Sequence, residues 1–266
     1  MMSEPCAVLC DLDGVVWLAH QPIPGSVAAI AALRSAGHRV LFVTNNSSAT
    51  VATQEEALAA IGIPAVGDVL TSAMAAALLI EPGDRVHVCG GPGIVEAVER
   101  RGGVVVDGVP CDAVMVGFHR SFDFAGLTVA ARLVRNGARL IGTNDDATYP
   151  TPDGPIPGGG SILAAVATAS GVAPRIAGKP HRPMAELVRG MIGEASASAA
   201  VMVGDRPDTD GLFARQLGCR YAIVWSGVTS PSVDVKPHPD IVGDDLAAVV
   251  DLVLQRNPIA ARRAEG

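Results

Sequence analysis

Aromatic residues are scarce in this chain of 266 residues. Five Phe, two Tyr and two Trp amount to 3% of it, although hydrophobic residues as a whole reach 49%. We therefore expect a core built from Ala, Val, Leu and Ile. The length suffices for one large core or for two modest domains.

Basic residues are outnumbered as well. With 20 Lys and Arg against 27 Asp and Glu, the formal net charge is −7, and the pI is near 5.3. This balance argues against nucleic acid or an anionic membrane as the partner. An anionic substrate would have to be held by a metal ion and a few local cations.

Long apolar runs and evenly paired cysteines are also missing. The mean hydropathy of +0.35 is high, yet no apolar run approaches the roughly 20 residues that a membrane span requires. The N-terminus lacks the basic region of a signal peptide. The five cysteines are an odd number without metal-type spacing, which is typical of reduced thiols. We expect a cytoplasmic protein that does not bind membranes.

Strand-like and helix-like segments alternate along the whole chain. Apolar runs that predict strands stand at 7–10, 40–43, 86–89, 104–106, 113–116, 140–141, 199–203 and 221–224. Segments of helical character stand at 27–33, 51–61, 94–101, 127–135, 212–217 and 246–254. This alternation predicts an α/β fold with a doubly wound, Rossmann-like parallel sheet.

The predicted organisation is a discontinuous core with an insertion. We expect a core domain at residues 1–77 and 178–260, a second α/β domain at 78–177, and a tail at 261–266. The segment Thr143–Gly160 is crowded with Pro, Gly, Asn and Asp. It predicts a long loop, and loops of that length in compact domains are usually functional.

Two aspartates stand directly after the first apolar run, Asp11 and Asp13, and Gly14 follows them. The carboxyl edge of a parallel sheet is where open α/β sheets bind ligands. Two carboxylates there repel each other unless a cation or a reacting group compensates, and Gly14 permits a sharp turn. The alternative interpretation is an ordinary strand end with Asx-turns.

Three further polar groups lie at or near strand ends. Thr44-Asn45-Asn46 can offer a hydroxyl and backbone N–H groups to a phosphate, or can cap a helix. Gly178-Lys179-Pro180 fixes a lysine that would otherwise be a solvated surface charge. Gly204–Asp210 holds three aspartates, which favour a hard cation or, alternatively, a capped helix start.

In this order the four groups resemble the motifs of the haloacid dehalogenase (HAD) superfamily of phosphatases, and the likeness spans essentially the whole chain. They look like the branch of p-nitrophenyl, phosphoglycolate and glycerol-3-phosphate phosphatases and some nucleotidases. That branch has a class II α/β cap between its second and third motifs, where this chain has its insertion. The segments Gly142–Thr151 and Pro157–Ser161 resemble that cap.

The resemblance implies Mg²⁺-dependent hydrolysis of small phosphomonoesters through an aspartyl-phosphate. It makes Asp11 the nucleophile and Asp13 the general acid and base. It assigns the metal to Asp11, the backbone carbonyl of Asp13, and Asp205. Asp210 is expected to lie next to these ligands without binding the metal itself. It assigns the phosphoryl group to Thr44, Asn45, Asn46 and Lys179. The chemistry agrees, because a carboxylate attacks a phosphate dianion only where cations and donors offset the repulsion.

Three positions in the expected cap are candidates for substrate selection. Asn144 and Asp146 lie in the predicted loop and are expected to contact the leaving group, unless they bind their own backbone in turns. His119 stands where the branch commonly has Asp in a Gly-Phe-Asp run. Its alternative interpretation is a surface histidine in a turn.

Other functions remain as alternatives. A nucleotidase is the alternative substrate class, and a phosphomutase or a phosphoacceptor signalling module is less favoured. Dehalogenases of the superfamily lack the second aspartate, so Asp13 argues against one. The glycine-rich run Cys89–Gly93 lacks the spacing of a dinucleotide or P-loop site. The expected partner is a small phosphorylated metabolite, and caps of this branch often dimerise, which implies a homodimer through the cap.

Overall fold

The structure is a computed structural model that describes residues 5–108, 110–151 and 153–255. These residues form two compact units. The first contains the chain up to Val43, Glu55–Val69 and the part from Val188 onward, and the second contains Thr44–Gln54 and Leu70–Leu187. The second unit thus includes residues 70–77 and 178–187, which were expected in the core, and it also takes in Thr44–Gln54. The predicted tail at 261–266 lies outside the described residues.

A six-stranded sheet forms the centre of the first unit. Its order is β15 (Ile241–Gly243), β14 (Arg220–Val224), β13 (Val201–Gly204), β1 (Ala7–Cys10), β4 (Arg39–Thr44), β5 (Val69–Thr71). β1 runs parallel to β4, with Cys10 opposite Phe42, and parallel to β13, with Cys10 opposite Val203. β1 and β13 are apolar and buried over their whole length, as expected of strands covered on both faces of a parallel sheet.

The strand order changes direction at β1. The chain leaves β1 for β4 on one side, and much later returns to β13 on the other side. Ligands of open α/β sheets bind at such a switch point, outside the carboxyl ends of the strands. Asp11 follows β1 and Asp205 follows β13. The doubly wound sheet predicted from the alternation is therefore confirmed, and its switch point lies between these two aspartates.

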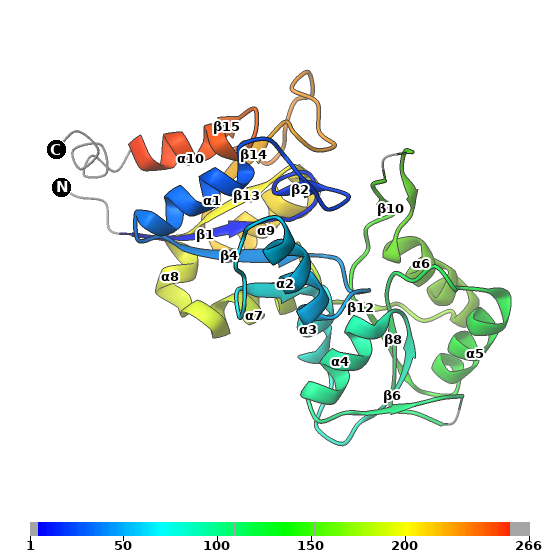
Figure 1. The fold of residues 1–266 in the computed structure, drawn as a ribbon. Coiled ribbons are helices and arrows are strands. Elements are labelled where there is room, and N and C mark those ends of the chain that lie inside the picture. Colours follow the sequence, from blue (N-terminus) through cyan, green and yellow to red (C-terminus); the bar gives the residue numbers. More distant parts are fainter. Residues whose placement is uncertain (1–4, 109, 152, 256–266) are drawn as a thin grey trace. The chain divides into compact units, whose positions relative to one another are not determined.

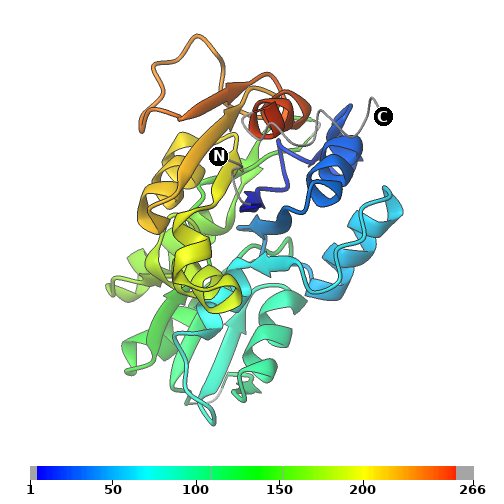
Figure 2. The ribbon, with the colours of Figure 1, turned by 90° about the vertical axis from the view of Figure 1, so that its left-hand side faces the viewer.

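Helices cover both faces of this sheet. α1 (Ser26–Ser35) and α10 (Leu246–Gln255) pack side by side on one face, and α8 (Glu194–Ser198) lies on the other (Figures 1 and 2). The remaining elements of this unit are the hairpin β2 (Trp17–Leu18) and β3 (Gln21–Pro22), the π-helical turn η1 (Pro207–Gly211) and α9 (Leu212–Leu217). Two helices are shared by the residue ranges of both units, α2 (Val51–Ala60) and α7 (Arg182–Ile192).

The second unit has its own parallel sheet of five strands. Its order is β12 (Arg175–Ile176), β9 (Arg139–Gly142), β8 (Ala113–Val116), β6 (Arg85–Cys89), β7 (Val104–Val106). α5 (Phe124–Arg135) and α6 (Gly159–Ser170) pack against each other on one face, and α4 (Pro92–Arg100), which packs with α3 (Ser72–Ala77), covers the other (Figure 1). Their buried core is aliphatic, for example Val114, Leu133 and Leu163, as the composition predicts.

The segment Thr143–Gly160 is more ordered than the predicted single loop. It contains the antiparallel hairpin β10 (Thr148–Tyr149) and β11 (Ile156–Pro157), and α6 begins at Gly159. Gly154, with a φ of +106°, lies in the turn of the hairpin, a conformation that favours glycine. Short strands and their turn have the composition of a loop, which explains why the sequence did not separate them.

No helix among the described residues is both long enough and apolar enough to span a membrane.

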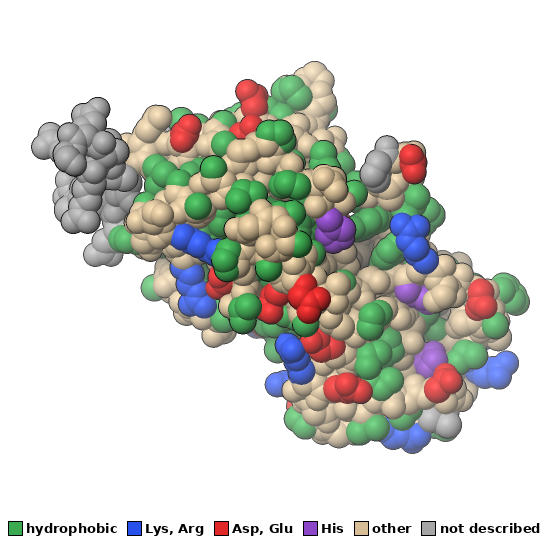
Figure 3. All heavy atoms as spheres, in the orientation of Figure 1, with side chains coloured by type: hydrophobic (Ala, Val, Ile, Leu, Met, Phe, Trp, Pro, Cys, Tyr) green, Lys and Arg blue, Asp and Glu red, His purple; other side chains and the backbone are tan. Residues whose placement is uncertain are grey.

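On the face that Figure 3 shows, acidic and basic side chains are interspersed with apolar ones, and neither sign of charge gathers into a single field.

Candidate active site

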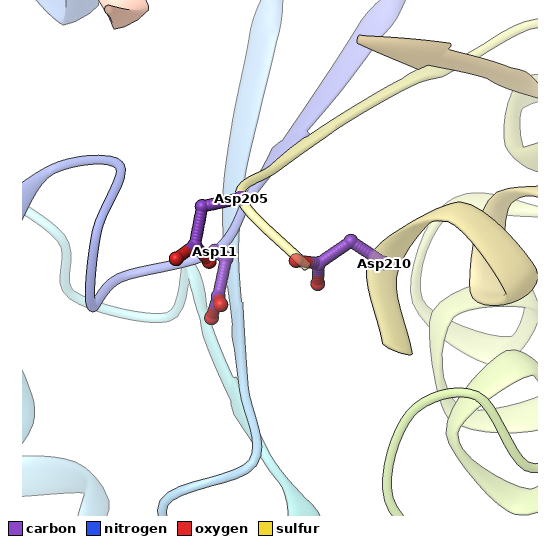
Figure 4. Close-up of side chains that lie close together, drawn as sticks. All are labelled: Asp11, Asp205 and Asp210. Atoms are coloured by element: carbon purple, nitrogen blue, oxygen red, sulfur yellow. The ribbon is translucent and has the colours of Figure 1, made fainter. Parts of the chain in front are cut away.

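Three carboxylates meet at the switch point of the first unit. Asp11, Asp205 and Asp210 each place a carboxylate oxygen so that these atoms all lie within 4.8 Å of one another (Figure 4). We call these residues the acidic cluster. Asp205 is 1% exposed and Asp210 is 0% exposed. Asp210 comes from η1 and points toward the other two, which come from strand ends.

Backbone hydrogen bonds fix the first two members of the cluster. The Asp11 N–H donates to the Val203 carbonyl of β13 (2.9 Å), and Asp11 Oδ1 accepts from the Leu12 N–H (2.8 Å). Asp205 Oδ2 accepts from the Val228 N–H (2.7 Å). The carboxylates are therefore positioned by strand pairing and by the loop after β14.

Glycines surround these carboxylates closely. A Cβ at Gly227 would lie 1.9 Å from Asp205 Oδ2, and one at Gly14, whose φ is +84°, would lie 2.5 Å from it. A Cβ at Gly204 would lie 2.1 Å from Asp210 Cγ. Contacts that short are impossible, so only glycine leaves the carboxylates where they are. Gly227 was not predicted from the sequence; the one available signal was its place just after a predicted strand at the same sheet edge.

The donor set of the acidic cluster fits a hard divalent cation. It consists of oxygen atoms only, which Mg²⁺ and Ca²⁺ prefer. Carboxylates this close repel one another, and burial weakens the screening by water, so a cation would relieve an unfavourable arrangement. Burial raises the pKa of the Tyr221 hydroxyl, and the nearby Asp210 and Asp205 carboxylates raise it further. The Tyr221 side chain is therefore a neutral phenol beside the cluster.

Asp13 lies in a tight turn directly after Asp11. It forms an isolated bridge with Trp17, and the Gly14 N–H donates to the Trp17 carbonyl (2.8 Å). Among the described residues, the acidic cluster consists of Asp11, Asp205 and Asp210, without the Asp13 carboxylate. Asp210 was expected behind the ligands, and the structure brings its carboxylate into the cluster itself.

The predicted phosphate-binding residues come together in the second unit. Thr44 is buried at the end of β4, and Lys179 is 1% exposed. The Thr44 hydroxyl oxygen accepts from the Asn46 N–H (3.1 Å), which leaves its hydrogen as a donor. The Asn46 side chain accepts from the Ser48 N–H (3.0 Å) in a turn. Asn45 Oδ1 accepts from the Lys179 N–H (2.8 Å).

The loop candidates Asn144 and Asp146 bind Asn45 rather than their own turns. Asn144 Nδ2 donates to the Asn45 carbonyl (2.5 Å), and Asp146 Oδ2 accepts from Asn45 Nδ2 (2.9 Å). Asn144 is 4% exposed. Both residues therefore lie beside the predicted phosphate-binding segment, which the sequence alone did not indicate.

His119 has its contacts within the second unit. Its Nε2 lies 3.7 Å from Cys89 Sγ, its Nδ1 lies 3.1 Å from Ser121 Oγ, and its ring meets Phe122 edge-on. Burial lowers the pKa of His119, against the opposing charge of Asp123. These contacts match the interpretation of a histidine held in its turn.

The glycine-rich run Cys89–Gly93 has a packing role. Gly91 caps the start of α4 and Pro92 is its first residue. A Cβ at Gly91 would lie 2.5 Å from the Ser48 carbonyl oxygen, and one at Gly93 would lie 2.2 Å from the Ala49 carbonyl oxygen. The run is glycine-rich because the chain at 48–49 passes directly against it.

Comparison with known proteins agrees with this geometry. Residues 8–103 match the model of the haloacid dehalogenase-like hydrolases, and residues 176–249 match a second HAD hydrolase-like model. D-glycerol 3-phosphate phosphatase of Mycobacterium tuberculosis is 37% identical over 93% of this chain and 71% of its own length. The 5'-nucleotidase YutF of Bacillus subtilis is 35% identical over 83% of this chain and 87% of its own length.

A solved structure is similar over nearly the whole chain. Glycerol phosphate phosphatase Rv1692 of M. tuberculosis in complex with magnesium has a TM-score of 0.84 and 35% identity, over 94% of this chain and 78% of that one. The fold and the site define an α/β protein with an acidic cluster at the switch point of its doubly wound sheet. The chain belongs to the haloacid dehalogenase-like hydrolases, and the family expected from the four motifs is confirmed.

Proposed function

We propose that this protein is a Mg²⁺-dependent phosphatase of small phosphomonoesters. The observation that carries the proposal is the acidic cluster, in which Asp11 stands beside Asp205 and Asp210 at the switch point of the sheet. A nucleophilic carboxylate next to a cation site is what phosphoryl transfer to an aspartate needs. The names of the similar proteins, a glycerol 3-phosphate phosphatase and a nucleotidase, support the same reaction class.

The residues divide the reaction into two steps. An Asp11 carboxylate oxygen attacks phosphorus, the bond from phosphorus to the ester oxygen breaks, and Asp13 gives its proton to the leaving oxygen. Water then attacks the aspartyl-phosphate, Asp13 takes a proton from it, and phosphate and the Asp11 carboxylate are released. One group thus serves as acid and then as base.

Cations and donors make the first step feasible. Asp11, the Asp13 carbonyl, Asp205 and Asp210 are the groups that would hold Mg²⁺, which when bound offsets the negative charge of the phosphoryl oxygens. Thr44, the Asn45 backbone and Lys179 supply a hydroxyl, an N–H group and an ammonium for the same oxygens. Thr44 and Lys179 are buried, which strengthens their interactions because water is excluded.

A phosphate-release screen with Mg²⁺ tests the reaction class. We expect catalytic release from small esters such as glycerol 3-phosphate, phosphoglycolate and p-nitrophenyl phosphate, and nucleoside 5'-monophosphates test the nucleotidase alternative. Release that stops after one equivalent would identify a phosphoacceptor module, and formation of an isomeric ester without free phosphate would identify a mutase. Either result would contradict the proposal.

Asp205→Asn is expected to raise the Mg²⁺ concentration for half-maximal activity at least about tenfold, since one charged ligand is lost from the cation site. A second readout avoids turnover: the rise of Tm that Mg²⁺ produces in the wild type should be lost, because a ligand stabilises only the state that binds it. Asp208→Asn is the matched control. Asp208 lies in the same loop but is exposed, and this variant should behave like the wild type.

Full activity of the wild-type protein in excess EDTA would contradict the metal assignment. So would an Asp205→Asn variant whose Mg²⁺ dependence of both activity and Tm equals that of the wild type.

We also propose a cytoplasmic location. All five cysteines lie within the described residues as thiols rather than disulfides. Such thiols persist in a reducing compartment.

The homodimer through the cap stays a prediction as well. Phe124, the first residue of α5, is 82% exposed. A subunit contact at the second unit would remove this large apolar side chain from water.

A further inference from the structure

The side-chain amide of Asn45 pairs with the backbone of Lys179, a residue 134 positions away. Its Oδ1 accepts from the Lys179 N–H (2.8 Å) and its Nδ2 donates to the Lys179 carbonyl (3.0 Å). The amide thus makes the two hydrogen bonds that a neighbouring strand would make. The N–H and the carbonyl of Lys179 are both held, and this fixes the direction of its Cα–Cβ bond.

A third hydrogen bond supports the same orientation of this amide. Asn45 Nδ2 also donates to Asp146 Oδ2 (2.9 Å), and an ionised carboxylate only accepts. If the amide were rotated by half a turn, its oxygen would face the Asp146 carboxylate and the Lys179 carbonyl, and its NH₂ would face the Lys179 N–H. All three hydrogen bonds would become repulsive contacts. Asp146 therefore reinforces the orientation that already pairs with both ends of the Lys179 backbone.

The residues before Asp146 bind the segment around Asn45 too. Asn144 Nδ2 donates to the Asn45 carbonyl, which also accepts from Ser72 Oγ (2.7 Å). The Thr143 hydroxyl donates to Ser47 Oγ (2.9 Å). Asn45 and Ser47 are therefore both bound by residues of Thr143–Asp146, which we call the bridging segment.

The bridging segment also binds the chain around Lys179. The Thr143 carbonyl accepts from the Gly178 N–H (2.7 Å), and Asp145 pairs with His181 (3.0 Å). A Cβ at Gly178 would lie 2.6 Å from both Asn45 Oδ1 and the Thr143 carbonyl oxygen. Glycine is required there because the segments approach so closely.

Burial makes these contacts consequential. Thr143 is 0% exposed, Asn144 4% and Lys179 1%, so water does not readily replace a hydrogen bond lost at these three residues. Asn45 and Asp146 are half-buried, and Asp145 is exposed. Each of the four consecutive residues of the bridging segment binds one of the two segments that carry the phosphate-binding groups of the proposed function. The segment is therefore placed to set the distance between those groups.

We propose that Asp146 is a positioning residue that acts through the Asn45 amide on Lys179. The inference rests on the proposed function, in which Lys179 and Thr44 hold the phosphoryl group. A positioning role for Asp146 differs from a role in leaving-group selection in one measurable way. Every substrate carries the same phosphoryl group, so a positioning defect lowers the rate with all esters alike, whereas a selectivity defect changes their ratio.

The test compares kcat/KM of Asp146→Ala for glycerol 3-phosphate and for p-nitrophenyl phosphate. We expect both values to fall at least about 30-fold, since misplacement by 1 Å can cost 100-fold, and we expect their ratio to stay within about threefold. Inhibition by inorganic phosphate should weaken in parallel. Asp146→Asn should recover most of the loss, because its carbonyl oxygen still accepts from Asn45. Asp107→Ala is the control, an exposed carboxylate of the same unit.

A double-mutant cycle tests whether Asp146 acts through Asn45. If it does, the double variant Asn45→Ala, Asp146→Ala is no slower than Asn45→Ala alone, whereas independent effects would multiply. If Asp146→Ala shows no cooperative melting transition, Asp146→Ser takes its place in the cycle.

Two results would overturn the inference. A ratio between the substrates that shifts tenfold or more would make Asp146 a selector of the leaving group. Unchanged kcat/KM and unchanged phosphate inhibition would show that the contact of Asp146 with Asn45 affects neither catalysis nor phosphate binding. In both cases the wild type still releases phosphate, and the proposed function stands. A wild type that neither releases phosphate from any ester nor binds it would instead remove the proposed function, and the inference with it.

Discussion

Asp11→Asn is expected to lower kcat/KM for every phosphate ester by at least about 10⁴-fold, the scale on which removal of a nucleophile acts in enzymes that use covalent catalysis. Asparagine keeps the shape of the side chain, and its Oδ1 can still accept from the Leu12 N–H, as Asp11 does at 2.8 Å. It cannot, however, form the aspartyl-phosphate. The measurement is phosphate release with Mg²⁺ present, and near wild-type release would end the proposed mechanism.

Thermal unfolding in EDTA separates a chemical defect from a folding defect. Asp11→Asn removes one of the three charges of the acidic cluster, whose oxygens lie within 4.8 Å of one another. Relief of that repulsion should leave Tm unchanged or raise it by roughly 2–4 °C for each kcal/mol gained in a domain of this size. A clear fall in Tm would show that the variant is inactive because it is misfolded.

The doubly wound sheet and its catalytic edge were accessible from the sequence because local rules determine them. Val8 to Cys10 and Val201 to Val203 are short apolar runs, and an aspartate follows each within two residues. In a parallel sheet all strand ends of one kind lie at one edge, so Asp11 and Asp205 could be placed together without knowledge of the register. Lys179 follows no such local rule and was singled out only by the resemblance to the family's motifs.

Contacts between distant segments were not accessible in this way. Nothing local to Asn45 indicates that its amide pairs with Lys179, because the pairing depends on how a loop 134 residues away approaches it. The same holds for Gly227, which is required by the position of Asp205 Oδ2 rather than by its own turn. Asn144 and Asp146 were selected for the polarity of their loop, whereas their partners follow from tertiary packing.

The division of the chain illustrates the same limit. Thr44 ends a strand of the central sheet, and the sequence placed it in the core with Asp11. In the structure, Thr44–Gln54 and Lys179 belong to the same compact unit as the five-stranded sheet. The bridging segment accounts for this, since its hydrogen bonds tie Asn45 and Ser47 to that unit. Motif order predicts roles for these residues, but it does not indicate which compact unit holds each of them.

Asp13→Asn is expected to lower kcat/KM more for substrates whose leaving oxygen must be protonated than for those whose leaving oxygen need not be. An alkoxide such as that of glycerol 3-phosphate leaves only if it is protonated, and loss of a general acid costs about 10²–10⁴-fold. p-Nitrophenolate leaves unprotonated. kcat/KM reports events up to transfer of the phosphoryl group to Asp11, so it should fall about 10³-fold for the alkyl ester and less than about tenfold for the aryl ester.

The second step gives an independent signature in the same variant. Without Asp13 as the base that activates water, the aspartyl-phosphate should accumulate, and p-nitrophenol should appear as a burst of one equivalent before slow turnover. The tight turn at Asp13, with Gly14 at a φ of +84°, accepts asparagine without strain, so Tm should remain that of the wild type. Equal losses of kcat/KM for both esters, without a burst, would mean that Asp13 neither protonates the leaving group nor activates water.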